Sequence, residues 1–244
     1  MNISYDEVMT KSKKSNWCPE KTLQHLLELE SDHRREKKIE SLIKQAGIPP
    51  QYTLETMDQK LLTPKLRKSL PALLEGGFVD RAENLLAFGL PGRGKSHYVG
   101  AIAREIILRH HKSVLFTSTF KLVEKLLNAK KELALENALK KLDRFDVVIL
   151  DDIGYVQQSR EEVEVLFTFL AERYERKSLI ITSNLVFSKW DQIFKDSMTT
   201  MAAIDRLIHH SIILDFPGPS IRELLKQNEQ QNKQTATKEQ LCEK

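Results

Sequence analysis

The sequence predicts an α/β fold with a parallel, doubly wound sheet, preceded by a small helical N-terminal domain. Short apolar runs alternate with longer segments of helical periodicity between residues 84 and 216, which is typical of strand–helix–strand units. The run at residues 145–150 (F-D-V-V-I-L) is typical of a strand buried on both faces of a parallel sheet. A glycine-rich loop also joins the first apolar run to a helical segment.

The composition indicates a nearly neutral chain with few cysteines. Its 244 residues have room for one α/β domain and a smaller companion, and the formal net charge is +4. Any affinity for nucleic acid must therefore come from local patches or from assembly of many copies. Cys18 and Cys242 form neither a disulfide framework nor a zinc cluster. Without a signal-peptide pattern or an apolar run of about 20 residues, we expect a soluble cytoplasmic protein with no membrane partner.

The first 62 residues are predicted to be mainly helical. Residues 1–16 are polar, and we expect a flexible arm or a weak helix. Residues 17–44 place leucine and isoleucine at helical spacings around a highly charged middle, which predicts one long amphipathic helix or two. We assign residues 17–62 to a helical N-terminal domain. A G-I-P-P stretch at 47–50 ends the helix, and Pro64 starts another that stops at residues 76–77.

A complete phosphate-loop motif, G-x-x-x-x-G-K-[ST], occupies residues 89–96, between a predicted strand at 84–88 and a predicted helix at 97–111. Glycines let the backbone wrap closely around a polyphosphate, so that N–H groups and the positive helix end face the anion. In this motif the lysine reaches the β- and γ-phosphates and the hydroxyl binds Mg²⁺. The predicted nucleotide-binding residues are Gly89, Leu90, Pro91, Gly92, Arg93, Gly94, Lys95, Ser96 and His97.

The segment before the first strand is irregular and leads straight into it. In phosphate-loop domains the wall that contacts the base usually lies in this part of the chain. Ile48 and Tyr52 are therefore candidates for an adenine pocket, although core packing explains these side chains equally well.

Residues 119–142 are predicted to form one helical stretch after a second strand at 113–117. Leucine and valine recur there at helical spacings, with six lysines elsewhere on the surface. Such lysines could follow a phosphate backbone, and the candidate DNA contacts are Lys121, Lys125, Lys130 and Lys131. An ordinary solvated face, balanced partly by three glutamates, explains the pattern at least as well.

Polar side chains follow two of the predicted strands. Asp151 and Asp152 come after the run at 145–150, and Asn184 follows a strand at 178–182. Because ligands bind at the carboxyl ends of strands in doubly wound sheets, we expect these side chains to meet the phosphate loop. The remaining predicted elements are helices at 161–175 and near 198–209, a strand at 211–216, and a polar, disordered tail at 226–244.

The converging residues fit the hydrolysis of ATP with Mg²⁺ as cofactor. Asp151 and the Ser96 hydroxyl would bind the metal, and Asp152 is the candidate base that orients and polarises the attacking water. Asn184 would steer the same water or contact the γ-phosphate. Structural alternatives stay open, because Asp151 could cap its strand, Asp152 could be purely structural and Asn184 favours turns on its own account.

Several motifs together resemble the IstB-type helper ATPases of insertion sequences, which are relatives of DnaC-type helicase loaders in the AAA+ class. Besides the phosphate loop, the motifs are L-D-D-I-G-Y, S-R-E-E, R-Y-E-R-K-S-L-I-I-T-S-N, F-S-K-W and I-D-R-L-I-H-H-S. The resemblance covers about residues 20–225 and implies an AAA+ ATPase domain at residues 63–225. It also implies a homo-oligomer on double-stranded DNA that recruits the transposase encoded by the same element and influences the choice of target.

The resemblance assigns roles to two further arginines. Arg206, in D-R-L-I-H-H, corresponds to an arginine finger that neutralises charge on the γ-phosphoryl group in the neighbouring subunit's ATP site. Arg222, in S-I-R-E, lies where related AAA+ proteins can carry a second γ-phosphate sensor. The chain departs from the family in having Asp-Asp where Asp-Glu is usual. The shorter Asp152 side chain withdraws the carboxylate by about an ångström, which can cost about a hundredfold in rate, so slow hydrolysis is expected.

Three other functions fit part of the sequence. A replicative helicase loader shares the same core but acts on a helicase and single-stranded DNA, and the N-terminal domain would distinguish the two. A DNA scaffold that senses ATP with little hydrolysis is the second alternative. A small-molecule kinase is the third, and the sequence contains no evident lid or acceptor site for one.

Overall fold

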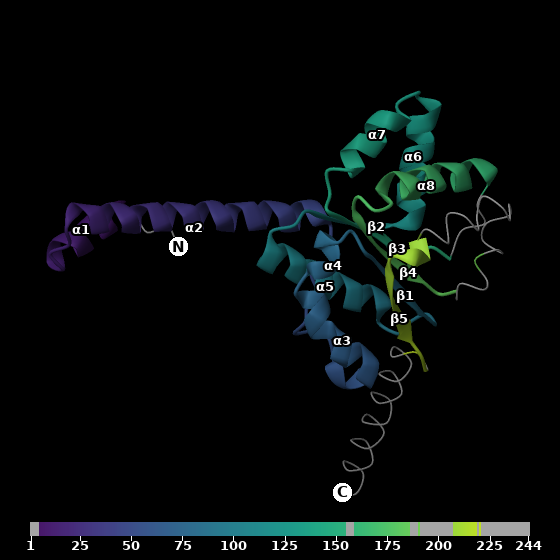
Figure 1. Ribbon diagram of the computed structural model, residues 1–244, viewed down its shortest axis with the longest axis horizontal. Coiled ribbons are helices and arrows are strands. Elements are labelled where there is room, and N and C mark those ends of the chain that lie inside the picture. The colour runs from purple at the N-terminus through teal and green to yellow at the C-terminus, as the bar shows by residue number, and fades with distance from the viewer. Residues whose placement is uncertain (1–4, 155–158, 186–189, 191–206, 219, 221–244) are drawn as a thin grey trace, which may run out of the picture.

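The fold is built on a five-stranded parallel sheet (Figure 1), seen in a computed structural model that describes residues 5–154, 159–185, 190, 207–218 and 220. The strand order is β2-β3-β4-β1-β5, and every neighbouring pair is parallel. Helices connect β1 to β2, β2 to β3 and β3 to β4, as parallel pairing requires. The strands are β1 (Asn84–Gly89), β2 (Val114–Ser118), β3 (Val147–Asp151), β4 (Ser178–Ser183) and β5 (Ser211–Phe216).

Helices cover both faces of the sheet, which confirms the predicted doubly wound α/β architecture. Alternate residues of β1 point to opposite faces, so Leu85 and Leu86 enter two different hydrophobic cores. One core lies under α3 (Pro64–Leu74) and α5 (Lys95–His110), and the other under α6 (Thr119–Lys131) and α8 (Arg160–Arg173). Burial on both faces explains why the strands read as continuous apolar runs rather than as alternating ones.

The N-terminal region is a pair of helices, α1 (Tyr5–Lys14) and α2 (Pro19–Ala46). With 28 residues, α2 is about 42 Å long, and most of it projects away from the sheet in Figure 1. Only its C-terminal end packs on the domain, where Leu42 and Ile43 join the core. Gly47 ends the helix in the left-handed conformation, as the G-I-P-P stretch predicts. No helix among the residues described is long and apolar enough to cross a membrane.

The connection from α2 to the sheet packs on the same domain. Met57 and Leu62 are buried in the core that also contains Leu85 of β1. A 3₁₀ turn at Gln59–Leu61 and the short helix α4 (Gly77–Asp80) lie on either side of α3. Met57 and Leu62 also line the same cavity as residues 91–97 of the phosphate loop. The proposed domain boundary between residues 62 and 63 stays a prediction.

The prediction of one helical stretch at residues 119–142 is wrong. The chain forms two helices, α6 (Thr119–Lys131) and α7 (Leu135–Leu142), because it turns back at Leu133. This residue adopts the left-handed conformation with φ of 56°. No glycine or proline marks the turn in the sequence, so helical periodicity continued across it. Residues 198–206 of the helix expected near 198–209, and the tail at 226–244, lie outside the described residues.

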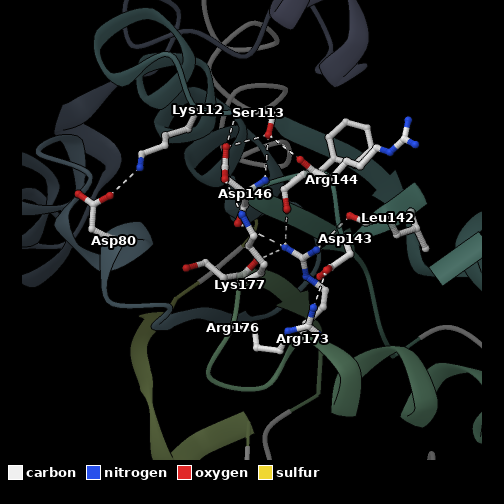
Figure 2. A network of polar contacts seen from close by, with 12 residues as sticks. Asp80, Lys112, Ser113, Leu142, Asp143, Arg144, Asp146, Arg173, Arg176 and Lys177 are labelled. Atoms are coloured by element: carbon white, nitrogen blue, oxygen red, sulfur yellow. Dashed lines mark hydrogen bonds and ion pairs between the residues drawn. The ribbon is translucent and has the colours of Figure 1, made fainter. Parts of the chain in front are cut away.

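A polar network joins the amino ends of β2, β3 and β4 (Figure 2). The Asp146 carboxylate accepts hydrogen bonds from the backbone N–H of Ser113 at 2.9 Å and from Lys177 Nζ at 2.8 Å. The buried Arg173 guanidinium donates to the carbonyl oxygens of Leu142, Phe145, Asp146 and Ser178. Burial lowers the pKa of Arg173 to about 10, so the group stays charged at neutral pH and ties α8 to these strands.

Asp146→Asn is expected to lower stability at neutral pH and to flatten the acid dependence of stability. Burial raises the pKa of Asp146, but hydrogen bonds from Lys177 and Ser113 outweigh burial, so the pKa falls from 3.8 to about 2. A carboxylate with a lowered pKa stabilises the fold above its unfolded value, and this contribution is lost as the pH falls through the folded value. Urea denaturation from about pH 7 down to about pH 2 measures the difference.

Asp80→Asn is the matched control, because this carboxylate pairs with Lys112 at 2.6 Å on the surface. Exposed ion pairs contribute little to stability, so the control variant should follow the unaltered chain. If the free energy of unfolding falls by the same amount between about pH 7 and pH 2 in Asp146→Asn and in the unaltered chain, the role given to Asp146 is wrong.

Candidate nucleotide-binding site

The loop between β1 and α5 has the backbone that the phosphate-loop motif predicts. Positive φ angles occur at Gly89 (152°), Gly92 (76°) and Gly94 (81°). A Cβ atom on Gly89 would lie 2.4 Å from the carbonyl oxygen of Phe216, so β5 passes too close for any side chain. Gly94 precedes the first residue of α5, which leaves the free N–H groups of that helix end facing the loop.

Lys95 is buried at the first turn of α5, and its side chain is 7% exposed. Its Nζ donates hydrogen bonds to Gly89 O at 2.7 Å, Leu90 O at 3.0 Å and Asn184 Oδ1 at 2.7 Å. Burial lowers the pKa of Lys95, and the charges of Asp152 and Asp151 partly offset this effect. The ammonium group thus lies at the centre of the strand ends, close to both carboxylates.

Asn184 joins the lysine to the second carboxylate. Its Oδ1 accepts from Lys95, and its Nδ2 donates to Asp152 Oδ1 at 2.8 Å. These two opposite partners determine which end of the amide is oxygen. Asp152 is a left-handed residue with φ of 61°, and burial together with the charge of Asp151 raises its pKa, against the effect of Lys95. The structure therefore brings together three residues that the sequence predicts to converge.

Thr182 is part of the site, although the sequence analysis did not include it. Its hydroxyl donates to Asp151 Oδ1 at 2.7 Å and accepts from the backbone N–H of Asp152 at 2.8 Å. The last residues of β4 thus hold the end of β3 in place. The available signal was its position, two residues before Asn184 at the end of an apolar strand, where a hydroxyl faces the neighbouring strand end.

A cavity of about 750 Å³ opens at these strand ends, within the range of small-molecule sites. The predicted residues 91–97, Asp151, Asp152 and Asn184 line it, and so does Thr182. Gly89 and Leu90 are not among the lining residues, and their carbonyl oxygens accept hydrogen bonds from Lys95. Arg206 and Arg222 lie outside the described residues.

The far wall of the cavity is formed by residues before the sheet. Tyr52 stacks on His97, with ring centroids 5.2 Å apart and an interplanar angle of 19°. His97 Nε2 lies 3.0 Å from Thr56 Oγ1 and 3.2 Å from Thr53 O. Thr56, Met57, Asp58, Leu61 and Leu62 complete this wall. Of the two adenine-pocket candidates, Tyr52 lines the cavity, whereas Ile48 packs against the hydrophobic core.

The loop is also attached to the chain that follows β5. Arg93 is buried, and its guanidinium donates to the carbonyl oxygen of Pro217. A Cβ atom on Gly218 would lie 3.2 Å from this guanidinium, so the two segments are closely packed. Arg93 therefore has a structural partner within the fold besides its place in the cavity lining.

The lysines proposed to contact DNA lie away from the cavity, on α6. Lys130 forms an ion pair with Glu164 of α8 at 2.8 Å. Within the part of the chain that the structure describes, Lys121, Lys125 and Lys131 are exposed and form no ion pair. These positions fit an ordinary solvated face and fit a surface that contacts phosphates equally well.

The fold and the site together define a phosphate-loop nucleotide-binding protein with a doubly wound α/β fold. Solved structures with the same fold include the DnaC helicase loader (TM-score 0.58, 19% identity, 69% of this chain and 100% of that chain). They also include DnaI (TM-score 0.58, 18% identity, 70% of this chain and 95% of that chain). At this level of identity, the similarity concerns the fold alone.

The chain belongs to the family of IstB-like ATP-binding proteins, whose model matches residues 1–231. It is 39% identical over 210 residues to an insertion-sequence ATP-binding protein of Sinorhizobium fredii, covering 86% of this chain and 70% of the relative. The ATP-binding protein of insertion sequence IS21 from Pseudomonas aeruginosa is 39% identical over 80% of this chain and 74% of its own length. A Geobacillus stearothermophilus relative from insertion sequence IS5376 is 35% identical over 96% and 88%.

Thr182→Val is expected to destabilise the site more than its small change in shape suggests. Valine fills the same space but leaves Asp151 without a donor and the Asp152 N–H without an acceptor. Each lost hydrogen bond costs about 0.5–1.5 kcal/mol, so urea denaturation should show a loss of about 1–3 kcal/mol for the two, together with weaker binding of ATP and Mg²⁺. Thr182→Ser keeps the hydroxyl and should retain most of the stability and most of the binding. Equal losses in the valine and serine variants would rule out the role of the hydroxyl.

His97→Ala is expected to weaken ATP binding without affecting inorganic tripolyphosphate. The substitution removes the contacts that hold residues 52–56 against the cavity, while the backbone N–H groups of the loop remain. Loss of about 1 kcal/mol of hydrogen bonding corresponds to roughly a fivefold change in Kd, measurable by calorimetry. Thr56→Val should act similarly, and the double variant should be less than additive. An equal loss for tripolyphosphate would contradict the assignment of this wall to the nucleoside.

Proposed function

We propose that the chain is an ATP-dependent regulator of DNA transposition that assembles on duplex DNA and recruits the transposase of its own insertion sequence. One observation carries this proposal: Lys95, Asp151, Asp152 and Asn184 converge on the cavity lined by the phosphate loop. The names of the similar insertion-sequence ATP-binding proteins support the setting.

The residues present fit ATP with Mg²⁺. The loop supplies backbone N–H groups and the buried Lys95 for the phosphates. The Ser96 hydroxyl and the Asp151 carboxylate are hard oxygen donors of the kind that Mg²⁺ prefers, and the metal supplies charge neutralisation on the phosphate oxygens when bound. All three hydrogen bonds of the Lys95 ammonium group are made with protein oxygens, so a triphosphate must compete for at least one of them.

Asp152 is the proposed base that orients the attacking water. Its raised pKa brings the carboxylate closer to the range useful for accepting a proton, and Asn184 holds one of its oxygens. Aspartate replaces the longer glutamate usual in the family, so the carboxylate reaches less far. We therefore propose slow hydrolysis, with ATP binding as the main signal for assembly and hydrolysis as the step that ends it.

Oligomerisation follows from the proposed role of Arg206. An arginine from an adjacent copy would complete the charge neutralisation that Lys95 begins, an effect of about 10³–10⁵ in rate in well-studied phosphoryl transfer. ATP between two subunits would then favour their association. Arg222 is proposed as a second sensor of the γ-phosphate. The exposed Lys121, Lys125 and Lys131 of α6 are proposed to contact the DNA backbone.

Arg206→Ala should retain ATP but lose hydrolysis and ATP-dependent assembly on DNA. Labelled ATP retention, phosphate release and sedimentation with a duplex oligonucleotide measure the three properties on the full chain. Lys95→Ala is the control for the nucleotide site. It removes the buried ammonium group that lines the cavity and donates to Asn184, so this variant should lose ATP retention itself. Normal turnover in Arg206→Ala would refute the finger.

Two further outcomes separate the alternatives. Assembly on duplex DNA with no phosphate release would favour an ATP-sensing scaffold over a hydrolysing regulator. Capture of a hexameric helicase, in preference to the transposase encoded beside the chain, would favour a helicase loader. The relatives at 35–39% identity are insertion-sequence proteins, whereas the DnaC helicase loader is 19% identical, which is why we propose transposition.

A further inference from the structure

Leu133, at the turn between α6 and α7, combines two unfavourable features. Its side chain is 97% exposed, and its backbone is left-handed with φ of 56°. The Leu133 N–H bonds to Lys130 O at 3.1 Å, and the Ala134 N–H bonds to Ala129 O at 2.8 Å. This pair of bonds is the Schellman motif that ends many helices, and its left-handed position is usually glycine.

The two hydrogen bonds hold this conformation, but the leucine side chain adds almost no packing that would favour it. A bulky residue with positive φ is a genuine outlier, and glycine or asparagine would end α6 more favourably. At 97% exposure, the leucine side chain gains almost no packing with its own chain in return. Strained residues of this kind are concentrated at functional sites, so the question is what the side chain contacts outside the chain.

The charge along α6 and α7, the two helices that the turn joins, indicates the kind of partner. Residues 119–142 contain six lysines and three glutamates, a net charge of +3, against +4 for the whole chain. Lys130 pairs with Glu164 at 2.8 Å and Lys140 with Glu136 at 2.6 Å. For the other four lysines, no ion pair occurs among the described residues, and all four side chains are exposed: Lys121, Lys125, Lys131 and Lys141. A polyanion is the complementary partner.

We propose that Leu133 enters the minor groove of duplex DNA and wedges between base steps, while Lys131 beside it and the exposed lysines further along α6 and α7 contact the phosphates. Proteins that bend DNA commonly insert an apolar side chain in this way, and a groove about 6 Å wide accepts a single projecting residue. A protein interface would need about 800 Å² on each partner with an apolar centre, whereas the neighbours of Leu133 are Glu132 and Ala134. The inference rests on the proposed function, because it requires duplex binding.

Leu133→Gly separates this contact from stability. Glycine relieves the left-handed strain, so the thermal midpoint of the full chain should rise. Affinity for duplex DNA, measured by fluorescence anisotropy with ATP, should nevertheless fall about tenfold because the wedge is lost. The slope of log K against log salt should stay unchanged, since leucine neutralises no phosphate. Lys131→Ala should instead reduce that slope by about 0.9.

A distortion assay tests the wedge itself. A duplex carrying 2-aminopurine should brighten when the unaltered chain unstacks it, and should brighten much less with Leu133→Gly. Leu133→Ala removes most of the side chain while keeping the strained backbone, so it should lose the fluorescence change without the gain in thermal midpoint. Leu108→Ala, at another exposed leucine on α5, should behave as the unaltered chain does.

The outcomes distinguish the wedge from the function on which it rests. Unchanged affinity and unchanged 2-aminopurine signal in Leu133→Gly, with firm duplex binding by the unaltered chain, would overturn the wedge alone. Failure of the unaltered chain to bind duplex DNA at any salt concentration would overturn the proposed function and the wedge together. A Leu133→Gly chain that keeps DNA distortion but loses its transposase would also overturn the wedge, because the leucine would then contact protein.

Discussion

The hydrogen bonds of the Lys95 ammonium group are the constraint on which the site depends. A buried cation is costly unless oxygens surround it, and here two carbonyls of the loop and the Asn184 amide do so. Asn184 in turn holds Asp152, so one buried charge aligns the ends of β1, β3 and β4. The geometry is possible only because all three strands are parallel and therefore end at the same edge of the sheet.

The same arrangement keeps opposite charges close without neutralising them completely. Asp151 is held by Thr182 and Asp152 by Asn184, and both carboxylates act on the pKa of Lys95 from a distance. Electrostatic effects are larger in such a half-buried cavity than in bulk water. An incoming anion therefore meets a cation that is already oriented, and an incoming divalent cation meets oxygen atoms that neighbouring strands already hold.

The strands and their polar ends could be predicted from the sequence, whereas the walls around them could not. Apolar runs and the phosphate-loop spacing are local signals, and they locate Lys95 and Asp151 correctly in the fold. Thr56 and Met57 reach the cavity only through tertiary packing of an irregular segment, so no periodicity marks them. The break in 119–142 was missed because Leu133 occupies a position where glycine usually gives the signal. Arg206 and Arg222 stay predictions.

The close packing of β5 against the phosphate loop has a consequence for the far end of the chain. Phe216 lies against Gly89, and Pro217 accepts a hydrogen bond from Arg93, so the loop cannot shift without displacing the backbone that leads to the C-terminus. A dye attached at residue 218 would therefore lie against the phosphate-loop end of the sheet and would not be a neutral appendage. Such a label would serve as a built-in reporter of loop movement.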